Sequence, residues 1–530
     1  MKSLLKFIRT QCKVAAFLLL PLLIVSCEWM KEDYEEGLSD LNNSDKYINL
    51  KIAVSTDYYP TRAGEVPASG ENGDGREAGF ERENEVRGVT LVLYRSDNGI
   101  NAAGSTLIDF VQYFPTTKEG SAATPDTQYG DTKECSEVTY TTGDQKMKDS
   151  KSIDITKTYH AIVIANANFE GTFIPGTTTL QQVRDYTFAY IHNGQSSTPA
   201  HQISNFVMSS ENDNFTLNFS AVLNMEDDTY YYRFTTPILI ERLAARIDFW
   251  TKGGTYVTKD KNNVNLPTSG YQYDAGDDWF VVTRITPFNL NSAEGGEYLI
   301  KRLTTDLSDG TKTAYLADEA ATKYVVDPSM SQKTGSTFPY TYKSDLQTEV
   351  IGRYAANPST ISSNPYSRTM ADMHKAVIED DKTAGYKSHK MNSSDETGYP
   401  DFIVGYAMEN TLLPTSPLAN FATGIAIEGD YYPEGSNADP SKVTHYVYYT
   451  YLRHQGISST AYTAYQASDF ITNFTTISDM SLSSWVMPFG VVRNNIYRIY
   501  IDEINEKGGW LKIAIEEKPW RHVDNPEIYI

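Results

Sequence analysis

Residues 48–54 read INLKIAV, and this short stretch indicates the fold class. Ile48, Leu50, Ile52 and Val54 alternate with less apolar residues along its whole length. Because successive side chains of a β-strand point to opposite faces, a period of two predicts a strand with one buried face. We therefore expect a strand that packs on a hydrophobic core near the start of the chain.

Other stretches with strand character are spread along the chain without a fixed period. They cover residues 89–94, 159–165, 215–219, 237–250, 279–285, 425–428, 445–452, 496–501 and 510–515. Helical patterns are confined to residues 180–190 and 369–380, and residues 251–275 and 305–400 have the composition of long polar connections. Strands that do not alternate regularly with helices favour antiparallel sandwiches. We therefore expect a mainly all-β protein with two antiparallel Greek-key β-sandwich domains and a few short helices in loops.

Length, charge and cysteine content exclude several classes of protein. At ~100–200 residues per domain, a chain of 530 residues suggests two or three domains. Lys and Arg number 46 against 68 Asp and Glu, a net charge of −22, which argues against a nucleic-acid partner. Cys12 and Cys27 lie in the N-terminal leader, so Cys135 alone remains. One mature chain therefore has neither a disulfide framework nor a cysteine-based zinc site.

Residues 1–26 predict a lipoprotein signal peptide. Four cations precede an apolar run at residues 14–25, which is shorter than the ~20 residues that span a bilayer but has the length of a signal-peptide core. The run ends at Cys27 in a sequence that resembles a bacterial lipobox; the alternative is an ordinary cleavage site with a chance cysteine. A multiply acylated Cys27 anchors the chain, and we expect no other membrane contact. Residues 27–62 then form a tether that includes the strand at residues 48–54.

A search for catalytic and metal-binding motifs finds none. The sequence has no G-x-S-x-G, H-E-x-x-H or G-x-x-x-x-G-K-[ST] motif. Residues 72–75 and 211–214 carry oxygen atoms suited to calcium without the spacing of a calcium loop, so polar turns are favoured and calcium stays an open alternative. Tyrosines at residues 230–232 and 446–451 suit either sugar stacking or cross-strand packing, and packing is the more usual role. We expect no enzyme activity, no cofactor and no metal site.

Seven segments occur in an order that is typical of one protein family. Residues 493–497 (RNNIY) are the most specific, and the others are residues 159–166 (YHAIVIAN), 205–209 (NFVMS), 241–247 (ERLAARI), 406–410 (YAMEN), 423–431 and 513–520 (IAIEEKPW). Together they resemble the fimbrillins, the subunits of Bacteroidales type V pili, and most strongly the shaft subunit of the minor fimbria. One departure is the short link at Gly508 and Gly509, where relatives can carry a longer proline-rich insert.

This resemblance implies a mechanism of export and assembly. A propeptide strand that presents Ile48, Leu50, Ile52 and Val54 fills a groove until an Arg-specific protease cuts between Arg62 and Ala63. A donor strand of a neighbouring copy then enters the groove. Its expected apolar residues, which alternate as a donor strand requires, are Leu511, Ile513, Ile515, Ile528 and Ile530. The alternative is that these C-terminal segments close their own sandwich.

The sequence therefore predicts a structural subunit of a cell-surface fimbria that supports adhesion. We expect an N-terminal domain at residues 63–240 and a C-terminal domain at residues 241–530 that carries the donor segment. The chain would be an outer-membrane lipoprotein precursor before it joins the fimbrium. Its expected partners are other copies of itself, accessory anchor and tip subunits, an Arg-specific protease, and a host or bacterial surface ligand. The alternatives are an anchor or tip subunit of the same pilus, a surface glycan-binding lipoprotein and, least favoured, an enzyme.

Overall fold

The structure, a computed structural model, is built mainly from β-strands. It describes residues 45–54, 77–78, 83–95, 103–119, 139–149, 153–188, 205–210, 213–226, 229–258, 269–291, 296–302, 325–328, 368–374, 401–411, 422–434, 440–452, 461–466, 490–505 and 510–521. Within these ranges α-helix is limited to α2 (Leu180–Arg184) and residues 370–374, both inside the predicted helical stretches. The prediction of a mainly all-β chain is confirmed.

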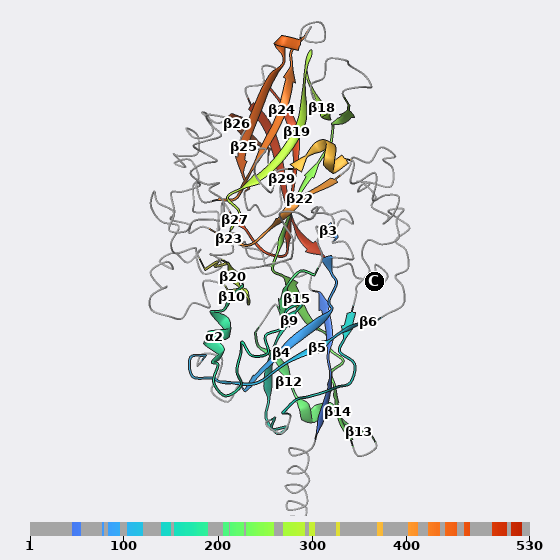
Figure 1. Cartoon of the computed structure of the whole chain (residues 1–530), viewed down its shortest axis with the longest axis vertical. Helices are drawn as coiled ribbons and strands as arrows, with labels where there is room; N and C mark the ends of the chain where they lie inside the picture. Colours follow the sequence, from blue (N-terminus) through green and yellow to red (C-terminus); the bar gives the residue numbers. More distant parts are fainter. Residues whose placement is uncertain are drawn as a thin grey trace, which may run out of the picture.

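The lower half of the molecule in Figure 1 contains two sheets. The smaller has the order β13 (Leu223–Glu226), β14 (Thr229–Arg233), β1 (Lys46–Asn49) and β8 (Gln145–Lys146). The larger has the order β5 (Ile108–Pro115), β4 (Gly88–Arg95), β9 (Tyr159–Ala165), β11 (Met208–Ser210), β15 (Ile238–Arg242), β2 (Lys51–Val54), β7 (Thr139–Thr141) and β6 (Thr117–Glu119), with β12 (Phe215–Leu217) on β9.

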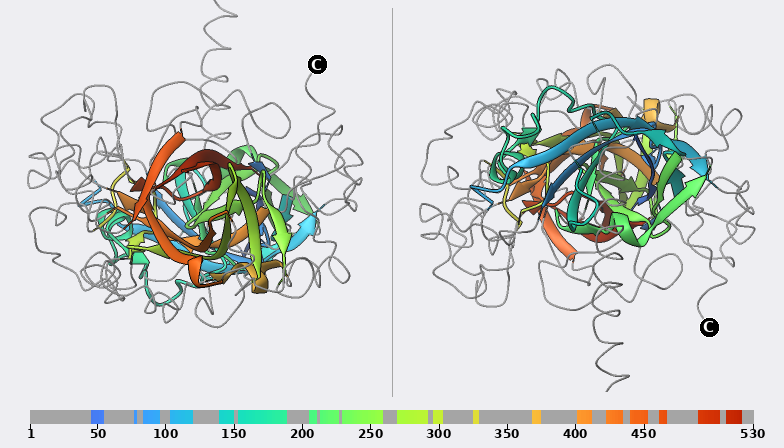
Figure 2. Two further views of the ribbon diagram at one scale, coloured as in Figure 1. Left: turned by 90° about the horizontal axis from the view of Figure 1, so that it is seen from above. Right: turned by 90° about the horizontal axis from the view of Figure 1, so that it is seen from below.

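The upper half contains one large sheet. Its order is β17 (Thr255–Val257), β18 (Gly270–Ala275), β19 (Asp278–Phe288), β24 (Gly424–Tyr432), β25 (Thr444–Tyr451), β26 (Ala461–Gln466), β29 (Trp510–Arg521), β28 (Asn495–Ile504), β16 (Ala245–Trp250) and β22 (Asp401–Ala407). β21 (Arg368–Thr369) joins β19, and β3 (Glu77–Ala78) joins β29. Two short sheets, β10 (Thr187–Phe188) with β20 (Glu297–Tyr298) and β23 (Asn410–Thr411) with β27 (Gly490–Val491), lie between the halves in Figure 1. Seen along the long axis, the strands of both halves surround that axis (Figure 2).

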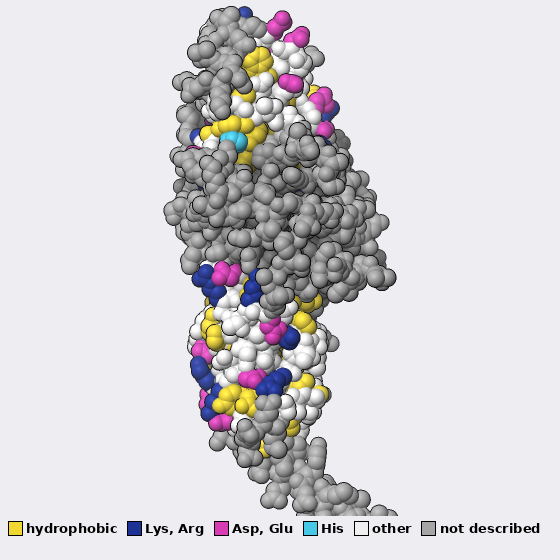
Figure 3. Space-filling model, turned by 90° about the vertical axis from the view of Figure 1, so that its right-hand side faces the viewer, with side chains coloured by type: hydrophobic (Ala, Val, Ile, Leu, Met, Phe, Trp, Pro, Cys, Tyr) yellow, Lys and Arg dark blue, Asp and Glu magenta, His cyan; other side chains and the backbone are white. Residues whose placement is uncertain are grey.

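Each half has its own hydrophobic core. The first core consists mainly of residues up to Ala244, and the second begins at Ala245. Six buried residues from later in the chain also join the first core: Leu299, Ile300, Ile403, Tyr406, Met408 and Ile496. A boundary at residues 240–241 would cut through β15, so we propose that the domains divide between Ala244 and Ala245. On the face shown in Figure 3, hydrophobic side chains lie in small groups among polar ones, as expected when the apolar residues of both halves are mostly inside.

Two features of the sheets differ from the sequence-based expectation. Most described strand pairs are antiparallel, but β1–β14, β2–β15, β16–β28 and β29–β3 are parallel. Parallel neighbours need a long crossover connection, and each of these pairs joins strands far apart in sequence. The polar connection expected at residues 251–275 also contains β17 and β18, because Tyr271 and Tyr273 supply a buried face between polar neighbours.

Candidate functional site: the N-terminal strand and the domain junction

The first described strand belongs to both sheets of the lower half. β1 and β2 are separated only by Leu50, so residues 46–54 pass from the smaller sheet into the larger one. In the smaller sheet β1 lies between β14 and β8, and in the larger sheet β2 lies between β15 and β7. The N-terminal strand, as we call residues 46–54, is therefore an interior strand twice over.

Backbone pairing holds the N-terminal strand on both sides. On one side it runs parallel to β14 and β15, with Ile48 opposite Tyr232 and Ile52 opposite Ile238. On the other it runs antiparallel to β8 and β7. At the crossing point the Leu50 N–H donates to Thr142 Oγ1 at 3.0 Å, and the Thr142 N–H donates to the Leu50 carbonyl at 3.1 Å. Hydrogen bonding thus continues through the crossing between the sheets.

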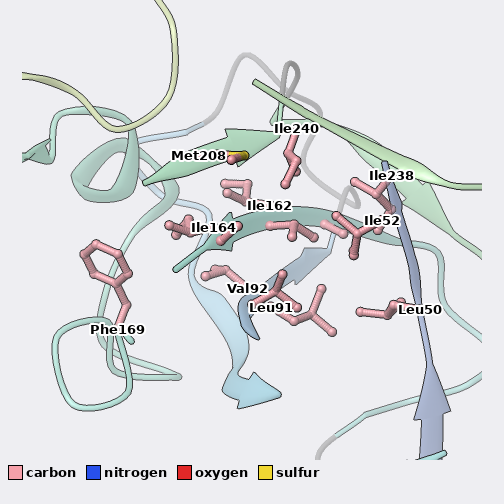
Figure 4. Close-up of a cluster of buried hydrophobic side chains, with 14 of the residues drawn as sticks. Leu50, Ile52, Leu91, Val92, Ile162, Ile164, Phe169, Met208, Ile238 and Ile240 are labelled. Atoms are coloured by element: carbon pink, nitrogen blue, oxygen red, sulfur yellow. The ribbon is translucent and has the colours of Figure 1, made fainter. Parts of the chain in front are cut away.

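The inward face of the N-terminal strand fills the first core. Ile48, Leu50 and Ile52 are completely buried, and Val54 is 3% exposed. Figure 4 shows Leu50 and Ile52 pointing from this strand toward side chains on β4 and β9. At ~1.5–3 kcal/mol for burying each large aliphatic side chain, these four residues contribute substantially to the core. The strand face that the sequence predicts to be buried is therefore buried in the structure.

Removal of the N-terminal strand would leave a groove with a defined chemistry. β14 and β15 would lose their parallel partner, and β7 and β8 would lose an antiparallel one. The groove floor would expose the apolar side chains that now touch the strand, and its walls would expose unpaired N–H and C=O groups. Such an edge binds another extended strand of matching pattern.

The chain that follows the N-terminal strand returns at the middle of the molecule. Arg62, Ala63 and residues 72–75 lie outside the described residues, as does Cys27. The first residues described after them form β3, which pairs with the end of β29 through Glu77 opposite Trp520. The stretch that contains the predicted cleavage site therefore connects the groove to the region between the two halves.

The C-terminal candidates are only partly within the described residues. Leu511 and Ile513 are completely buried in the second core, where β29 lies between β26 and β28. Ile515 is opposite Ile499 in the same ladder. Ile528 and Ile530 lie outside the described residues. Leu511 and Ile513 thus pack within their own domain, in the arrangement that the sequence offered as the alternative to donation.

The junction between the two halves contains buried ions as well as apolar side chains. Arg246 donates to both oxygens of Asp248, with contacts of 2.7–3.0 Å, and to Glu83 Oε2 at 3.0 Å. The Tyr406 hydroxyl donates to the other oxygen of Glu83. Arg242 donates to the Glu83 carbonyl at 3.1 Å and to Asn494 Oδ1 at 2.8 Å. Although burial opposes it, Asp248 and Glu83 raise the pKa of Arg246.

A second buried cluster surrounds Arg493, which is 1% exposed. Its Nη2 lies 2.7 Å from Glu409 Oε2 and 3.6 Å from Glu297 Oε1, and its Nη1 donates to the Leu299 carbonyl at 3.3 Å. Glu297 Oε2 accepts from the Glu409 N–H at 2.7 Å. Burial raises the pKa of Glu297 well above its usual value, with Arg493 opposing the rise and Glu409 adding to it.

Five of the family-like segments meet at this junction. Arg242 and Arg246 come from ERLAARI, Arg493 and Asn494 from RNNIY, and Tyr406 and Glu409 from YAMEN. Phe206 of NFVMS packs on Tyr406, with ring centroids 4.6 Å apart. Asn166 of YHAIVIAN adopts a positive φ and donates to the carbonyls of Glu85 and Phe206 at 2.8 Å. The sequence identifies these segments but does not predict that they meet, because no spacing rule links segments so far apart.

The other candidate groups have structural roles among the described residues. Asp213 of the polar run 211–214 accepts from Arg184 through its side chain and from the Tyr94 hydroxyl through its carbonyl, at 2.6 Å in the latter case. Tyr232, Tyr448 and Tyr451 are completely buried, which suits cross-strand packing, whereas Tyr230, Tyr231 and Tyr446 are half-buried. The part of the chain that the structure describes holds no group of three or more metal-ligating side chains. Nor do the described helices include one long and apolar enough to cross a membrane.

Comparison with known proteins finds similarity only among solved structures. The chain matches no family model and no curated protein sequence. It is similar to the tip fimbrial protein Mfa3 from Porphyromonas gingivalis with C-terminal truncation, at 9% identity and a TM-score of 0.38, over 90% of this chain and 100% of that one. It is also similar to a proposed cell adhesion protein from Parabacteroides distasonis, at 12% identity and a TM-score of 0.35, over 90% of this chain and 100% of that one. A third similar structure is a fimbrial assembly protein from the same species, at 9% identity and a TM-score of 0.29, over 89% of this chain and 99% of that one. These structures are fimbrial and adhesion proteins, but likenesses this distant carry no argument about this chain.

Proposed function

We propose that this chain is a structural, non-catalytic subunit of a cell-surface fimbria. In this proposal it is exported as a lipoprotein precursor, cut after Arg62 and polymerised by strand exchange, and it supports adhesion. The observation that carries the proposal is the N-terminal strand, which is interior to both sheets of its domain and runs parallel to β14 and β15. The family-like segments of the sequence support it independently.

The position of the strand suits a removable part. Its ladder contacts involve backbone groups, which any extended segment offers, and its inward face needs only alternating apolar side chains. A cut after Arg62 would separate this strand, and the lipid on Cys27, from the rest of the chain. The rest would keep its anchor at the junction, because Glu83 lies beyond the cut and is held by Arg246 and Tyr406.

The donor is proposed to be a C-terminal segment of a neighbouring copy. β29 ends at Arg521, and Leu511 and Ile513 already fill the second core. Donation by these two residues would require β29 to leave β26 and β28. Donation by residues 522–530, which include Ile528 and Ile530, would leave that pairing intact, so we place the donor there. A head-to-tail contact of this kind propagates as an open filament.

The cleavage step is tested with Arg62→Ala. We expect this variant to accumulate as lipid-bound, unpolymerised precursor, while fimbriae sheared from wild-type cells begin at Ala63 by N-terminal sequencing. Arg76→Ala, in the same stretch of sequence, is the matched control and should polymerise normally. Filaments of normal length from Arg62→Ala would refute the proposed switch.

The donor step is tested by deleting residues 522–530. We expect the truncated chain to fold and melt like the full chain but to form no filaments in electron micrographs. Ile513→Ala is the contrasting variant, because it should lower the stability of the monomer by about 2–5 kcal/mol. A truncated chain that melts normally and still assembles would rule out a donor in this segment.

The anchor is tested with Cys27→Ala and metabolic labelling with a fatty acid. We expect the label to be lost and delivery to the outer membrane to be impaired. Cys12→Ala, which changes the other cysteine of the leader, should keep the label. Label that persists on Cys27→Ala would show that another residue is acylated.

A further inference from the structure

The inward face of the N-terminal strand is not apolar throughout. Lys46, Ile48, Leu50, Ile52 and Val54 are all buried and alternate along it. The first of these is a lysine, and it is completely buried. A charged side chain at a buried position opposes the hydrophobic contribution of its neighbours, because removing it from water is unfavourable. A strand with an apolar residue in place of Lys46 would therefore bind more tightly in the groove.

Two carboxylates stabilise the charged form of Lys46, but burial has the larger effect on its pKa. Burial lowers its pKa to about 8, and the carboxylates of Asp154 and Asp45 act in the opposite direction. Asp45 also pairs with Lys146 at 2.5 Å. Asp154 Oδ1 accepts from the Thr156 N–H and hydroxyl, at 2.9 and 2.7 Å. Both carboxylates thus have other partners besides Lys46.

Lys51 on the same strand shows the ordinary arrangement for comparison. Its side chain is 36% exposed and pairs with Glu119 at 3.0 Å on the outer side of the sheet. Exposed pairs of this kind contribute little to stability. Lys51 therefore has little effect on how tightly the N-terminal strand is held in the groove, whereas Lys46 weakens that binding.

We propose that Lys46 weakens the hold of the groove on its own strand, so that after cleavage the C-terminal segment of a second copy displaces that strand more readily. The inference rests on the proposed function, since it gives a direction to the exchange. The precursor is still held while the chain is continuous, because a strand joined covalently to its groove has a high effective concentration. Cleavage removes that advantage, and the buried charge then favours release.

The test measures how long the cut strand stays in the groove, without any need for polymerisation. The full chain is cut with an arginine-specific endoproteinase, and the bound N-terminal fragment is followed over time by size exclusion and mass spectrometry. We expect Lys46→Met, which keeps the length and removes the charge, to lengthen the half-life of the bound fragment by about tenfold or more. Asp154→Asn should shorten it, because the amide oxygen still accepts from Thr156 but the compensating charge is gone.

Lys51→Met is the matched control, and its half-life should stay within about twofold of wild type because its pair is exposed. Equal half-lives for Lys46→Met and wild type would overturn the inference. The inference would also be overturned if the cut fragment stayed bound in the wild type and in every variant. If Lys46→Met lengthens the half-life but released chains form no filaments, the inference about Lys46 is supported and the proposed function fails.

Discussion

The N-terminal strand and the domain junction are both buried, but their chemistry is opposite. The strand contributes mainly aliphatic side chains and backbone ladders, which another strand of the same pattern is able to reproduce. The junction places Arg242, Arg246 and Arg493 against fixed acceptors from distant segments, such as Glu83 and Glu409. A strand of alternating apolar residues does not supply that set of groups. The N-terminal strand is therefore suited to replacement by another strand, whereas the junction is suited to hold its segments permanently.

The largest effect is expected at the junction. Arg493→Met should lower the free energy of unfolding by about 3–5 kcal/mol, because it leaves Glu409 buried without its cation. Thermal unfolding of the intact chain measures this loss. Glu297→Gln, in the same cluster, is the control and should be nearly neutral, because an amide imitates the neutral carboxyl that burial favours there. Equal losses from both variants would mean that Glu297 acts as an anion.

A somewhat smaller and different effect is expected in the groove. Ile52→Ala should lower the stability of the intact chain by about 2–5 kcal/mol through a cavity in the first core. The same variant should also speed release of the cut strand, whereas Arg493→Met should not. Leu239→Ala, on the neighbouring strand but 39% exposed, should change stability by only about 0.5 kcal/mol. A strand that is retained equally well with Ala at position 52 would contradict the view that volume holds it.

A partly exposed ion network around His445 gives the smallest effect and shows how much burial matters. His445 donates to Asp430 at 2.8 Å and lies 3.2 Å from Glu428, and these two hydrogen bonds raise its pKa to about 9. A raised pKa stabilises the fold fully below the ordinary value of about 6.5, and the contribution is lost as the pH rises through about 9. Because His445 is 39% exposed, we expect a contribution of about 1 kcal/mol or less.

The check is the difference in melting temperature between wild type and His445→Gln, measured from about pH 6 to about pH 10. The wild type should be the more stable at the acid end, and the difference should shrink toward the alkaline end. A constant difference across this range would show that His445 acts through packing and not through its charge.

Local patterns predicted much of the fold but not the pairing of its strands. Period-two alternation identified residues 48–54, and a compact apolar run identified β9, because each signal is contained within a few residues. β22 and β26 were missed, since Gly405 and the alanines of β26 dilute their apolar character. The parallel pairing of β1 with β14 had no local signal, because it depends on a connection that spans most of the domain.

The buried arginines show the same limit for the candidate site. Arg246 and Asp248 are two residues apart on one strand, a spacing that ordinarily indicates an exposed pair. Glu83 and Tyr406, which lie far from this strand in sequence and on opposite sides of it, bind to each other and to Arg246 and help to bury the pair. The burial of Lys46 also has no local signal, because a lysine that precedes an apolar strand is ordinarily exposed.

The orientation of the N-terminal strand also has a mechanical consequence. In Figure 1 the N-terminal strand, drawn in dark blue, runs along the length of the lower half, and it is hydrogen-bonded on both sides in both sheets. A pull along that direction loads the ladder in shear, so that the bonds must break together, whereas a sideways pull would open them one after another. An occupant of this groove is therefore strong against tension while it remains free to enter or leave stepwise from one end.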